Sequence, residues 1–269
     1  CIVALGLSPY LEKIFDLVTP IRLAELANPN RPMLKQLAEQ APGTFQHTLF
    51  VTTLAEAGAR AMDCNVELVR TGTLYHDIGK LHAPEFFIEN QFGGPNKHAD
   101  IDSPWQSAEI IRKHVTEGLV MARKIGLPTA VQAFIPEHQG TMLIAFFYHQ
   151  ACQQAQQNAS HPVSVSEVDF RYVGPTPQSR ETGIVMLADS CEAALRAMKQ
   201  SDPAVALRTI KQIFKTRWED QQLNDARLSR DDLDVLAQVF VSVWQQVNHE
   251  RIPYPQPIAL PLRKPHAKT

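Results

Sequence analysis

Apolar side chains recur every three or four residues along most of this chain, which is the period of an amphipathic helix. The stretch from 44 to about 62 places His47 and Leu54 on one apolar stripe. The alanine-rich stretch from 184 to about 199 shows the same period, with Asp189 inside it. Alternation with a period of two, which indicates strands, is nearly absent. The pattern therefore predicts an all-α fold.

Capping residues followed by proline, and glycines or prolines after apolar stretches, set the limits of the predicted helices. Thr19-Pro20 is one such start, and Ser103-Pro104 is another. A break near 114–118 is an option within the longest middle helix. The predicted helices lie near 9–17, 20–27, 32–40, 44–62, 65–79, 103–124, 128–140, 141–157, 184–199, 203–222 and 229–250.

Two polar stretches rich in proline and glycine, 82–102 and 158–182, are predicted as loops. Apolar residues alternate within the second loop, so a short strand there is an alternative to an extended segment. We predict an N-terminal helical linker at 1–40, one helical domain at 41–252 and a proline-rich, poorly packed tail at 253–269.

The composition is that of an ordinary globular chain of 269 residues, with 44% apolar and 20% charged residues. Its 26 basic and 28 acidic side chains give a net charge of −2, without the basic excess of nucleic-acid binders, so we predict no DNA or RNA duplex as partner. Four cysteines without a CxxC spacing predict neither a zinc clip nor a disulfide framework, and they indicate a reducing, cytoplasmic setting.

The chain begins with an apolar stretch, residues 1–7, and lacks an initiator methionine. This stretch is far shorter than the ~18 residues that a membrane helix needs. We expect a fragment of a longer protein, in which these residues are either the end of a membrane span or the first buried segment. Composition leaves both open.

Histidines and aspartates lie among apolar residues in several of the predicted helices. Each buried polar group without a partner costs on the order of 1–3 kcal/mol, and a bound divalent cation supplies that partner. Imidazole and carboxylate ligands without a thiolate favour iron, manganese or zinc. Any one of these histidines alone is ordinarily a hydrogen-bonded core residue, but the set predicts a metal site. Its members are His47, His76, Asp77, His114, His138 and Asp189.

The segment Tyr75-His76-Asp77-Ile78-Gly79-Lys80, with single histidines before and after it, resembles the HD phosphohydrolase superfamily. The chain is most similar to the cytoplasmic HD domain of the seven-transmembrane HD proteins, the PgpH-type cyclic-di-AMP phosphodiesterases. Further similar segments lie at 41–47, 87–91, 137–141, 170–175, 177–179 and 187–190. The resemblance implies that 41–252 is an HD-domain helical bundle with added N- and C-terminal helices.

The resemblance implies two divalent transition-metal ions, iron or manganese. It assigns His47, His76, Asp77 and Asp189 to the first ion, and Asp77, His114 and His138 to the second. Where the family has a second histidine, this chain has Gln139. Water replaces that ligand, the second ion binds loosely, or the site holds one ion only; these alternatives remain open.

The implied reaction is hydrolysis of a cyclic dinucleotide, cyclic-di-AMP to pApA, by a metal-activated hydroxide. Asp77 is the implied bridging carboxylate that orients the nucleophile, and Lys80 contacts a phosphate or the leaving group. Thr176 stands where the family has a lysine, so one phosphate contact is lost unless Arg180 replaces it; both alternatives remain open. The residues expected to contact the substrate are Lys80, Phe87, Tyr148, Arg171, Tyr172 and Arg180.

Two other functions remain open on the sequence. One is an HD phosphohydrolase acting on a dNTP, ppGpp or a 5′-nucleotide. The other is a nucleotide-binding sensor whose site is impaired by the Gln139 and Thr176 departures. The resemblance also implies a parent protein anchored through a missing N-terminal region, with this domain at the cytoplasmic face of the membrane. The oligomeric state is not predicted.

Overall fold

The computed structural model describes residues 10–12, 14–157, 164–198 and 202–247. In this part of the chain the only β contact is an isolated antiparallel bridge between Leu143 and Arg171, which confirms the all-α prediction. The second predicted loop is therefore extended, with one 3₁₀ turn, η5 (Glu167–Phe170), and no strand among its described residues. The apolar stretch 1–7 and the tail 253–269 lie outside the described residues.

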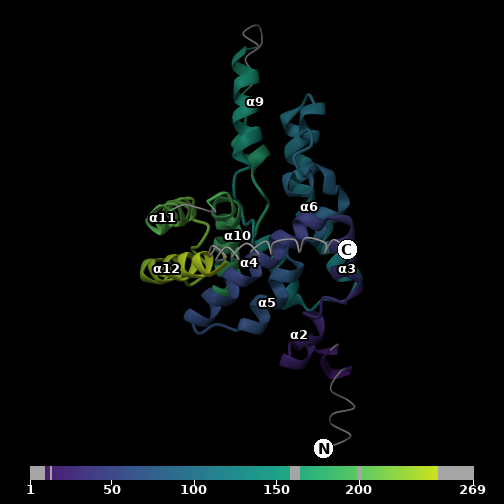
Figure 1. Cartoon of the computed structure of the whole chain (residues 1–269). Helices are drawn as coiled ribbons and strands as arrows, with labels where there is room; N and C mark the ends of the chain where they lie inside the picture. Colours follow the sequence, from purple (N-terminus) through teal and green to yellow (C-terminus); the bar gives the residue numbers. More distant parts are fainter. Residues whose placement is uncertain (1–9, 13, 158–163, 199–201, 248–269) are drawn as a thin grey trace, which may run out of the picture.

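From residue 20 on, the helices follow the predicted order along the chain, and the helix predicted near 9–17 lies partly outside the described residues (Figure 1). They are α2 (Pro20–Leu26), α3 (Pro32–Gln40), α4 (Pro42–Ala61), α5 (Val66–Tyr75), α6 (Pro104–Lys124), α7 (Thr129–Gln132), α8 (Phe134–Glu137), α9 (Ala145–Gln157), α10 (Arg180–Ala197), α11 (Pro203–Glu219) and α12 (Arg230–Val247). Four 3₁₀ turns occupy the first predicted loop and its approach: η1 (Ile78–His82), η2 (Pro84–Phe86), η3 (Ile88–Asn90) and η4 (Lys97–Asp100). No helix among the described residues is both long and apolar enough to cross a membrane.

The helices expected to end at 79 and 222 end earlier, at Tyr75 and Glu219, and the 3₁₀ turn η1 follows the first of them. Two further boundaries differ because of contacts that the helical period does not encode. The α9 helix begins at Ala145 rather than near 141, since Met142 and Ile144 bond through their backbones to the 170–172 segment. The α10 helix begins at Arg180 rather than Ile184, because Ser179 forms a capping box with Thr182.

Two other helices differ in continuity. The alternative of a helix break near 114–118 is wrong, because α6 runs unbroken from Pro104 to Lys124. The helix expected over 128–140 is instead two short helices, α7 and α8, that meet at Ala133.

The central helix is α4, which packs against α3, α5, α10 and α12 (Figure 1). Val51 and Leu54 of α4 are fully buried in the main core, together with Ile184 of α10 and Phe240 of α12. The apolar stripe that predicted this helix is therefore the one that the neighbouring helices cover. The same stripe carries His47 into the middle of the bundle.

A second core joins the N-terminal helices to the segment that follows α5. Leu23 of α2 and Leu34 of α3 are buried there with Tyr75 and Ile78. The Tyr75 hydroxyl donates a hydrogen bond to the Leu26 carbonyl oxygen at 2.9 Å. Residues 20–40 are thus packed onto the bundle, and they fix the chain on both sides of residues 76 and 77. The domain limits at 40 and 252 stay predictions.

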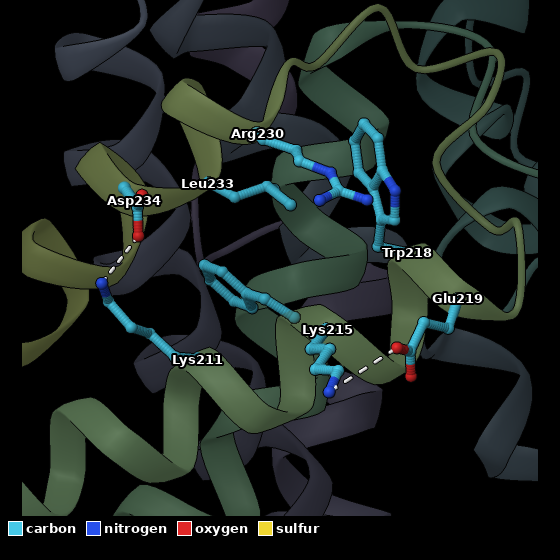
Figure 2. A pocket seen from close by; sticks show the side chains of 8 residues that line it. Lys211, Lys215, Trp218, Glu219, Arg230, Leu233 and Asp234 are labelled. Atoms are coloured by element: carbon cyan, nitrogen blue, oxygen red, sulfur yellow. Dashed lines mark ion pairs between the residues drawn. The ribbon is translucent and has the colours of Figure 1, made fainter.

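The C-terminal helices α11 and α12 form a groove of about 270 Å³ away from the histidines (Figure 2). Its charged groups are largely engaged with one another: Lys211 pairs with Asp234 at 2.7 Å, and the Arg230 guanidinium lies 5.4 Å from the Trp218 ring centroid. No residue that the sequence predicted for catalysis or binding lines this groove.

Close approach of η1 to α6 brings two parts of the histidine cluster together. A Cβ atom on Gly79 would lie 1.7 Å from the carbonyl oxygen of His114 and 2.5 Å from the amide nitrogen of Gly118. Both are backbone atoms, which cannot rotate away. Only glycine allows η1, and with it Asp77, to lie this close to His114.

We expect Gly79→Ala to lower the free energy of unfolding by about 1–3 kcal/mol, the usual cost of overpacking, in urea unfolding monitored by circular dichroism. Lys113→Ala, on the solvent side of α6, is the matched control and should change stability by less than about 0.5 kcal/mol. A Gly79→Ala protein as stable as the control would show that η1 and α6 are not tightly apposed.

Candidate metal centre

The six residues predicted as metal ligands come from separate segments and meet inside the bundle. Five of them are buried, and Asp189 is partly exposed. They are His47 in α4, His76 and Asp77 directly after α5, His114 in α6, His138 directly after α8, and Asp189 in α10. Their donor atoms form two groups that have Asp77 in common.

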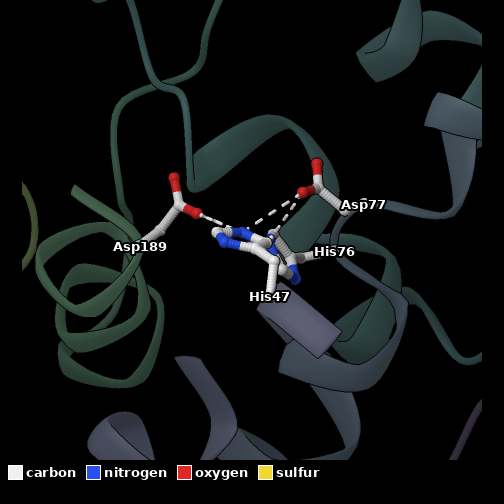
Figure 3. Close-up of side chains that lie close together, drawn as sticks. All are labelled: His47, His76, Asp77 and Asp189. Carbon is white, nitrogen blue, oxygen red and sulfur yellow. Dashed lines mark ion pairs between the residues drawn. The ribbon is translucent and has the colours of Figure 1, made fainter. Parts of the chain in front are cut away.

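The first group consists of His47, His76, Asp77 and Asp189, whose side chains point toward one another (Figure 3). The Nε2 atom of His47 lies 2.9 Å from Asp189 Oδ1 and 3.5 Å from Asp77 Oδ2. The Nε2 atom of His76 lies 3.3 Å from the same Asp77 oxygen. Ligand atoms at ~2.1 Å from one ion lie roughly 3 Å from each other, so these separations suit a divalent cation.

The second group consists of Asp77, His114 and His138. The Nε2 atoms of both histidines lie 3.6 Å from Oδ1 of Asp77, which is the oxygen that the first group does not use. One carboxylate therefore offers a donor atom to each group. This arrangement suits a bridging ligand between two ions.

The donor atoms at the centre are buried without hydrogen-bond partners. These atoms are Nε2 of His47, His76, His114 and His138, and Oδ1 of Asp77, whereas Oδ2 of Asp77 faces the Lys80 ammonium at 2.8 Å. Leaving so many buried polar atoms without partners is costly, and one or two cations would supply partners for all of them. The cluster therefore fits divalent metal binding.

The opposite ring nitrogen of each histidine is anchored outside the cluster. Nδ1 of His76 lies 2.6 Å from the Thr73 carbonyl oxygen, and Nδ1 of His114 lies 2.6 Å from that of Ile111. His138 makes the same contact with its own helix, at 3.0 Å. Because a carbonyl oxygen only accepts, Nδ1 carries a proton, and Nε2 is the ring nitrogen that can offer a lone pair to a bound cation.

Charge and burial shift the pKa values of the centre in opposite directions. Burial alone would lower the pKa of both His47 and His76. The carboxylates of Asp189 and Glu192 outweigh it at His47, and those of Asp77 and Asp189 outweigh it at His76. The pKa of His47 is raised to about 9 and that of His76 to about 10. At the second group, burial is the main cause that lowers the pKa of His114 to about 3. The first group therefore holds protons at neutral pH, whereas His114 is neutral.

Lys80 is a fixed cation beside the centre. Its Nζ atom lies 2.8 Å from Asp77 Oδ2 and 2.8 Å from Glu89 Oε1. The Thr44 hydroxyl donates to the same Glu89 oxygen at 3.0 Å. Burial opposes the charge, but the two carboxylates outweigh it and hold the pKa of Lys80 above its ordinary value. The ammonium group is thus charged and held in place.

Two of the aromatic residues predicted for substrate contact flank the second group. The ring centroids of Phe87 and Tyr172 lie 5.9 and 5.8 Å from that of His114. Phe87 is buried, and the Lys80 ammonium lies 5.2 Å from its ring centroid. These rings form an apolar wall beside His114.

The other predicted substrate residues are engaged elsewhere. The Arg171 guanidinium binds Glu167 and Asp220, the latter at 2.9 Å, and Arg180 pairs with Asp232 at 3.2 Å. The ring of Tyr148 in α9 packs against Phe170, with centroids 5.8 Å apart. The six-residue cluster includes none of the three, and their contact with a substrate stays a prediction.

Both departures from the family pattern have a definite place. Gln139 follows His138 directly, at the group that has three donor side chains where the first has four. The Thr176 hydroxyl donates to Asp225 at 3.0 Å.

Two carboxylates around the centre were missed on the sequence. Glu89 holds Lys80, and Glu192 lies 2.9 Å from Nδ1 of His47. The only sequence signal for Glu192 is its position three residues after Asp189 on the same helix, which places both on one face.

Residues 44–194 match the family model described as the HD domain. The chain belongs to the HD-domain family. The crystal structure of the HD domain of Listeria monocytogenes phosphodiesterase PgpH in complex with cyclic-di-AMP has the same fold, with a TM-score of 0.75 and 34% sequence identity over 82% of this chain and 99% of that domain. This confirms both the HD-domain helical fold and the resemblance to the PgpH-type proteins.

Longer relatives match this chain over part of their own length. Cyclic-di-AMP phosphodiesterase PgpH of Bacillus subtilis is 36% identical over 255 residues, which cover 95% of this chain and 35% of that protein. An uncharacterised protein of Synechocystis sp. is 62% identical over 253 residues, covering 94% of this chain and 31% of that protein. The HD-domain chain thus spans about a third of the length of these curated relatives.

We expect the affinity for Mn²⁺ to rise between pH 6 and pH 8. Below a pKa of about 9 for His47 and about 10 for His76, an incoming ion has to displace protons, so acidification weakens binding. Isothermal titration in HEPES and in Tris at pH 7.5 should show a buffer-dependent heat from about one to two released protons. His47→Gln should release about one proton fewer; affinity that does not change over this pH range would contradict the charge states above.

Proposed function

We propose that this chain is a metal-dependent phosphodiesterase that hydrolyses a cyclic dinucleotide, cyclic-di-AMP, to linear pApA. The observation that carries the proposal is the pair of buried donor groups that share the Asp77 carboxylate. Membership of the HD-domain family supports a hydrolase. The substrate is supported by the PgpH relatives, which are cyclic-di-AMP phosphodiesterases, and by the Listeria HD domain, whose structure contains cyclic-di-AMP.

We propose that the two groups hold two divalent ions, iron or manganese, with the ligand sets described above. Such a pair, when bound, supplies an activated hydroxide and neutralises charge that develops on the phosphate oxygens. Asp77 orients this chemistry because each of its oxygens faces a different group. The carbonyl contacts of the His76, His114 and His138 rings keep three Nε2 atoms directed at the centre.

Lys80 is the chain's own cation at the reacting phosphate. Its ammonium group has three donors, of which Asp77 and Glu89 use two. We propose that the remaining donor contacts a non-bridging oxygen or the leaving 3′ oxygen. Because Glu89 and Asp77 hold Nζ from two sides, the Lys80 side chain loses little additional conformational entropy when it binds the substrate.

A cleft of about 690 Å³ between α6 and the 168–173 segment offers room for the nucleoside part of the substrate. Trp105, Arg112, Arg171 and Tyr172 are among its lining residues. Aromatic rings suit stacking on a base, and guanidinium groups suit a phosphate. Tyr172 also contacts the His114 ring, so it connects the cleft to the second donor group.

One alternative has a specific observation in its favour. The second group has three donor side chains, and Thr176 stands where the family has a lysine. A chain that binds cyclic-di-AMP at such a site without cleaving it would be a nucleotide sensor.

We also propose that the chain works at the cytoplasmic face of a membrane, as one part of a longer anchored protein. The support is the resemblance to the seven-transmembrane HD proteins and the share of about a third that the chain covers of its relatives. The linker at 1–40 and the tail at 253–269 are part of the same proposal.

The first test of function is a substrate panel with the Mn²⁺-loaded or Fe²⁺-loaded chain. We expect turnover of cyclic-di-AMP to pApA, measured by chromatography, and much slower turnover of dATP and ppGpp. Asp77→Asn removes the shared charge and should lower kcat by on the order of 10²–10³-fold. Lys113→Ala on the outer face of α6 serves as the control that keeps wild-type rates.

Preference for dATP or ppGpp would replace the proposed substrate by another HD substrate. Tight cyclic-di-AMP binding without product, with either metal, would favour the sensor. Full activity of Asp77→Asn would refute the shared-carboxylate site itself.

We expect Gln139→His to raise the metal content of the purified chain toward two ions, because it adds an imidazole donor beside His138. Metal analysis after dialysis, with cyclic-di-AMP turnover as a second readout, measures the effect. Gln139→Ala should leave the metal content at the wild-type level. If neither substitution changes metal content or turnover, position 139 has no role at the second group.

A further inference from the structure

His47 differs from the other three histidines of the centre in the partner of its Nδ1 atom. His76, His114 and His138 each meet a backbone carbonyl of their own helix or turn. Nδ1 of His47 instead lies 2.9 Å from the Glu192 Oε2 atom, which belongs to a helix distant in sequence. One histidine in four is thus backed by a carboxylate instead of a backbone carbonyl.

The α10 helix supplies a carboxylate to each side of the His47 ring. Asp189 Oδ1 lies 2.9 Å from Nε2, and Glu192 Oε2 lies 2.9 Å from Nδ1. The two acidic residues are three positions apart, so both project from one face of α10 toward α4. Asp189 belongs to the donor group, whereas Glu192 lies behind the ring, outside that group.

Glu192 is buried, with 3% of its surface exposed, which is a costly place for a carboxylate. Its other oxygen pairs with Arg196, one helical turn further along, and the Arg196 side chain is 39% exposed. A line of contacts therefore runs from the surface through Arg196 and Glu192 to His47 and the centre. Glu192 contacts Nδ1 of His47, and the opposite nitrogen of that ring, Nε2, faces the first group.

We infer that Glu192 is a positioning residue that sets the metal affinity of the first group by holding and polarising the His47 ring. A carboxylate at Nδ1 fixes the tautomer with Nε2 free, and it makes Nε2 a stronger donor than a carbonyl partner does. The inference rests on the metal binding in the proposed function, but not on the substrate or the reaction. Glu192 touches neither a substrate nor the reacting atoms.

The test is the affinity of the metal-stripped full chain for Mn²⁺, measured by isothermal titration at pH 7.5. Loss of such an outer partner typically weakens metal binding 10–100-fold. In our proposal the first group, which has more donor side chains, binds Mn²⁺ more tightly than the second. We expect its Kd to rise about tenfold in Glu192→Gln, which keeps the shape of the side chain and loses its charge, and up to about a hundredfold in Glu192→Ala. Glu181→Gln is the matched control, because Glu181 lies on the same helix but belongs to neither donor group, and its carboxylate accepts from the backbone amide of Asn65. The Kd of this variant should equal that of the wild type.

A purely structural role gives a different result. Glu192→Gln would then lower the urea stability of the metal-free chain while its Kd for Mn²⁺ stayed within twofold of the wild type, and this outcome overturns the inference. If Glu192→Ala does not fold, the Gln variant decides, since it preserves the side-chain volume. A wild-type chain that binds Mn²⁺ but cleaves no cyclic dinucleotide would refute the proposed reaction without altering the Kd comparison.

Discussion

The Asp77 carboxylate, buried between four histidines, is the constraint around which the bundle is arranged. One oxygen lies 3.3 Å from His76 Nε2, and the other lies 3.6 Å from both His114 and His138. A buried charge in this position requires cations around it. Lys80 supplies one at 2.8 Å, and the unpartnered ring nitrogens leave room for more. The close backbone approach at Gly79 is what brings Asp77 within reach of α6.

The two donor groups are unequal. The first has four donor side chains, two carboxylates among them, and the ring of His47 is backed by Glu192. The second has three donor side chains, and carbonyl oxygens back its histidines. Charge and ligand number both favour the first group, so it is the tighter of the two in our proposal. Gln139, which replaces the second histidine of the family pattern, therefore lies at the group that binds its ion less tightly.

In our proposal, the surroundings of the centre separate reaction from recognition. Lys80, clamped by Glu89, lies at the donor atoms, whereas Phe87 and Tyr172 line the side of His114. Arg171 is bound to Glu167 and Asp220 and ties the 167–171 segment to the turn after α11. That ion pair shapes the cleft beside the centre, which is a role the sequence does not suggest for an arginine expected to meet phosphate.

The helical period and the capping residues determined the all-α fold and most helix positions, because both are local properties of the chain. The spacing of polar residues on apolar stripes also identified the six residues that meet at the centre. What only the tertiary structure decided are contacts between distant side chains: Glu192 behind His47, Glu89 on Lys80, and Arg180 paired with Asp232. The sequence pattern of a charged residue on a helix face is the same whether its side chain is solvated or contacts the ring of a metal-ligating histidine. Its partner is chosen by the packing of another helix against it.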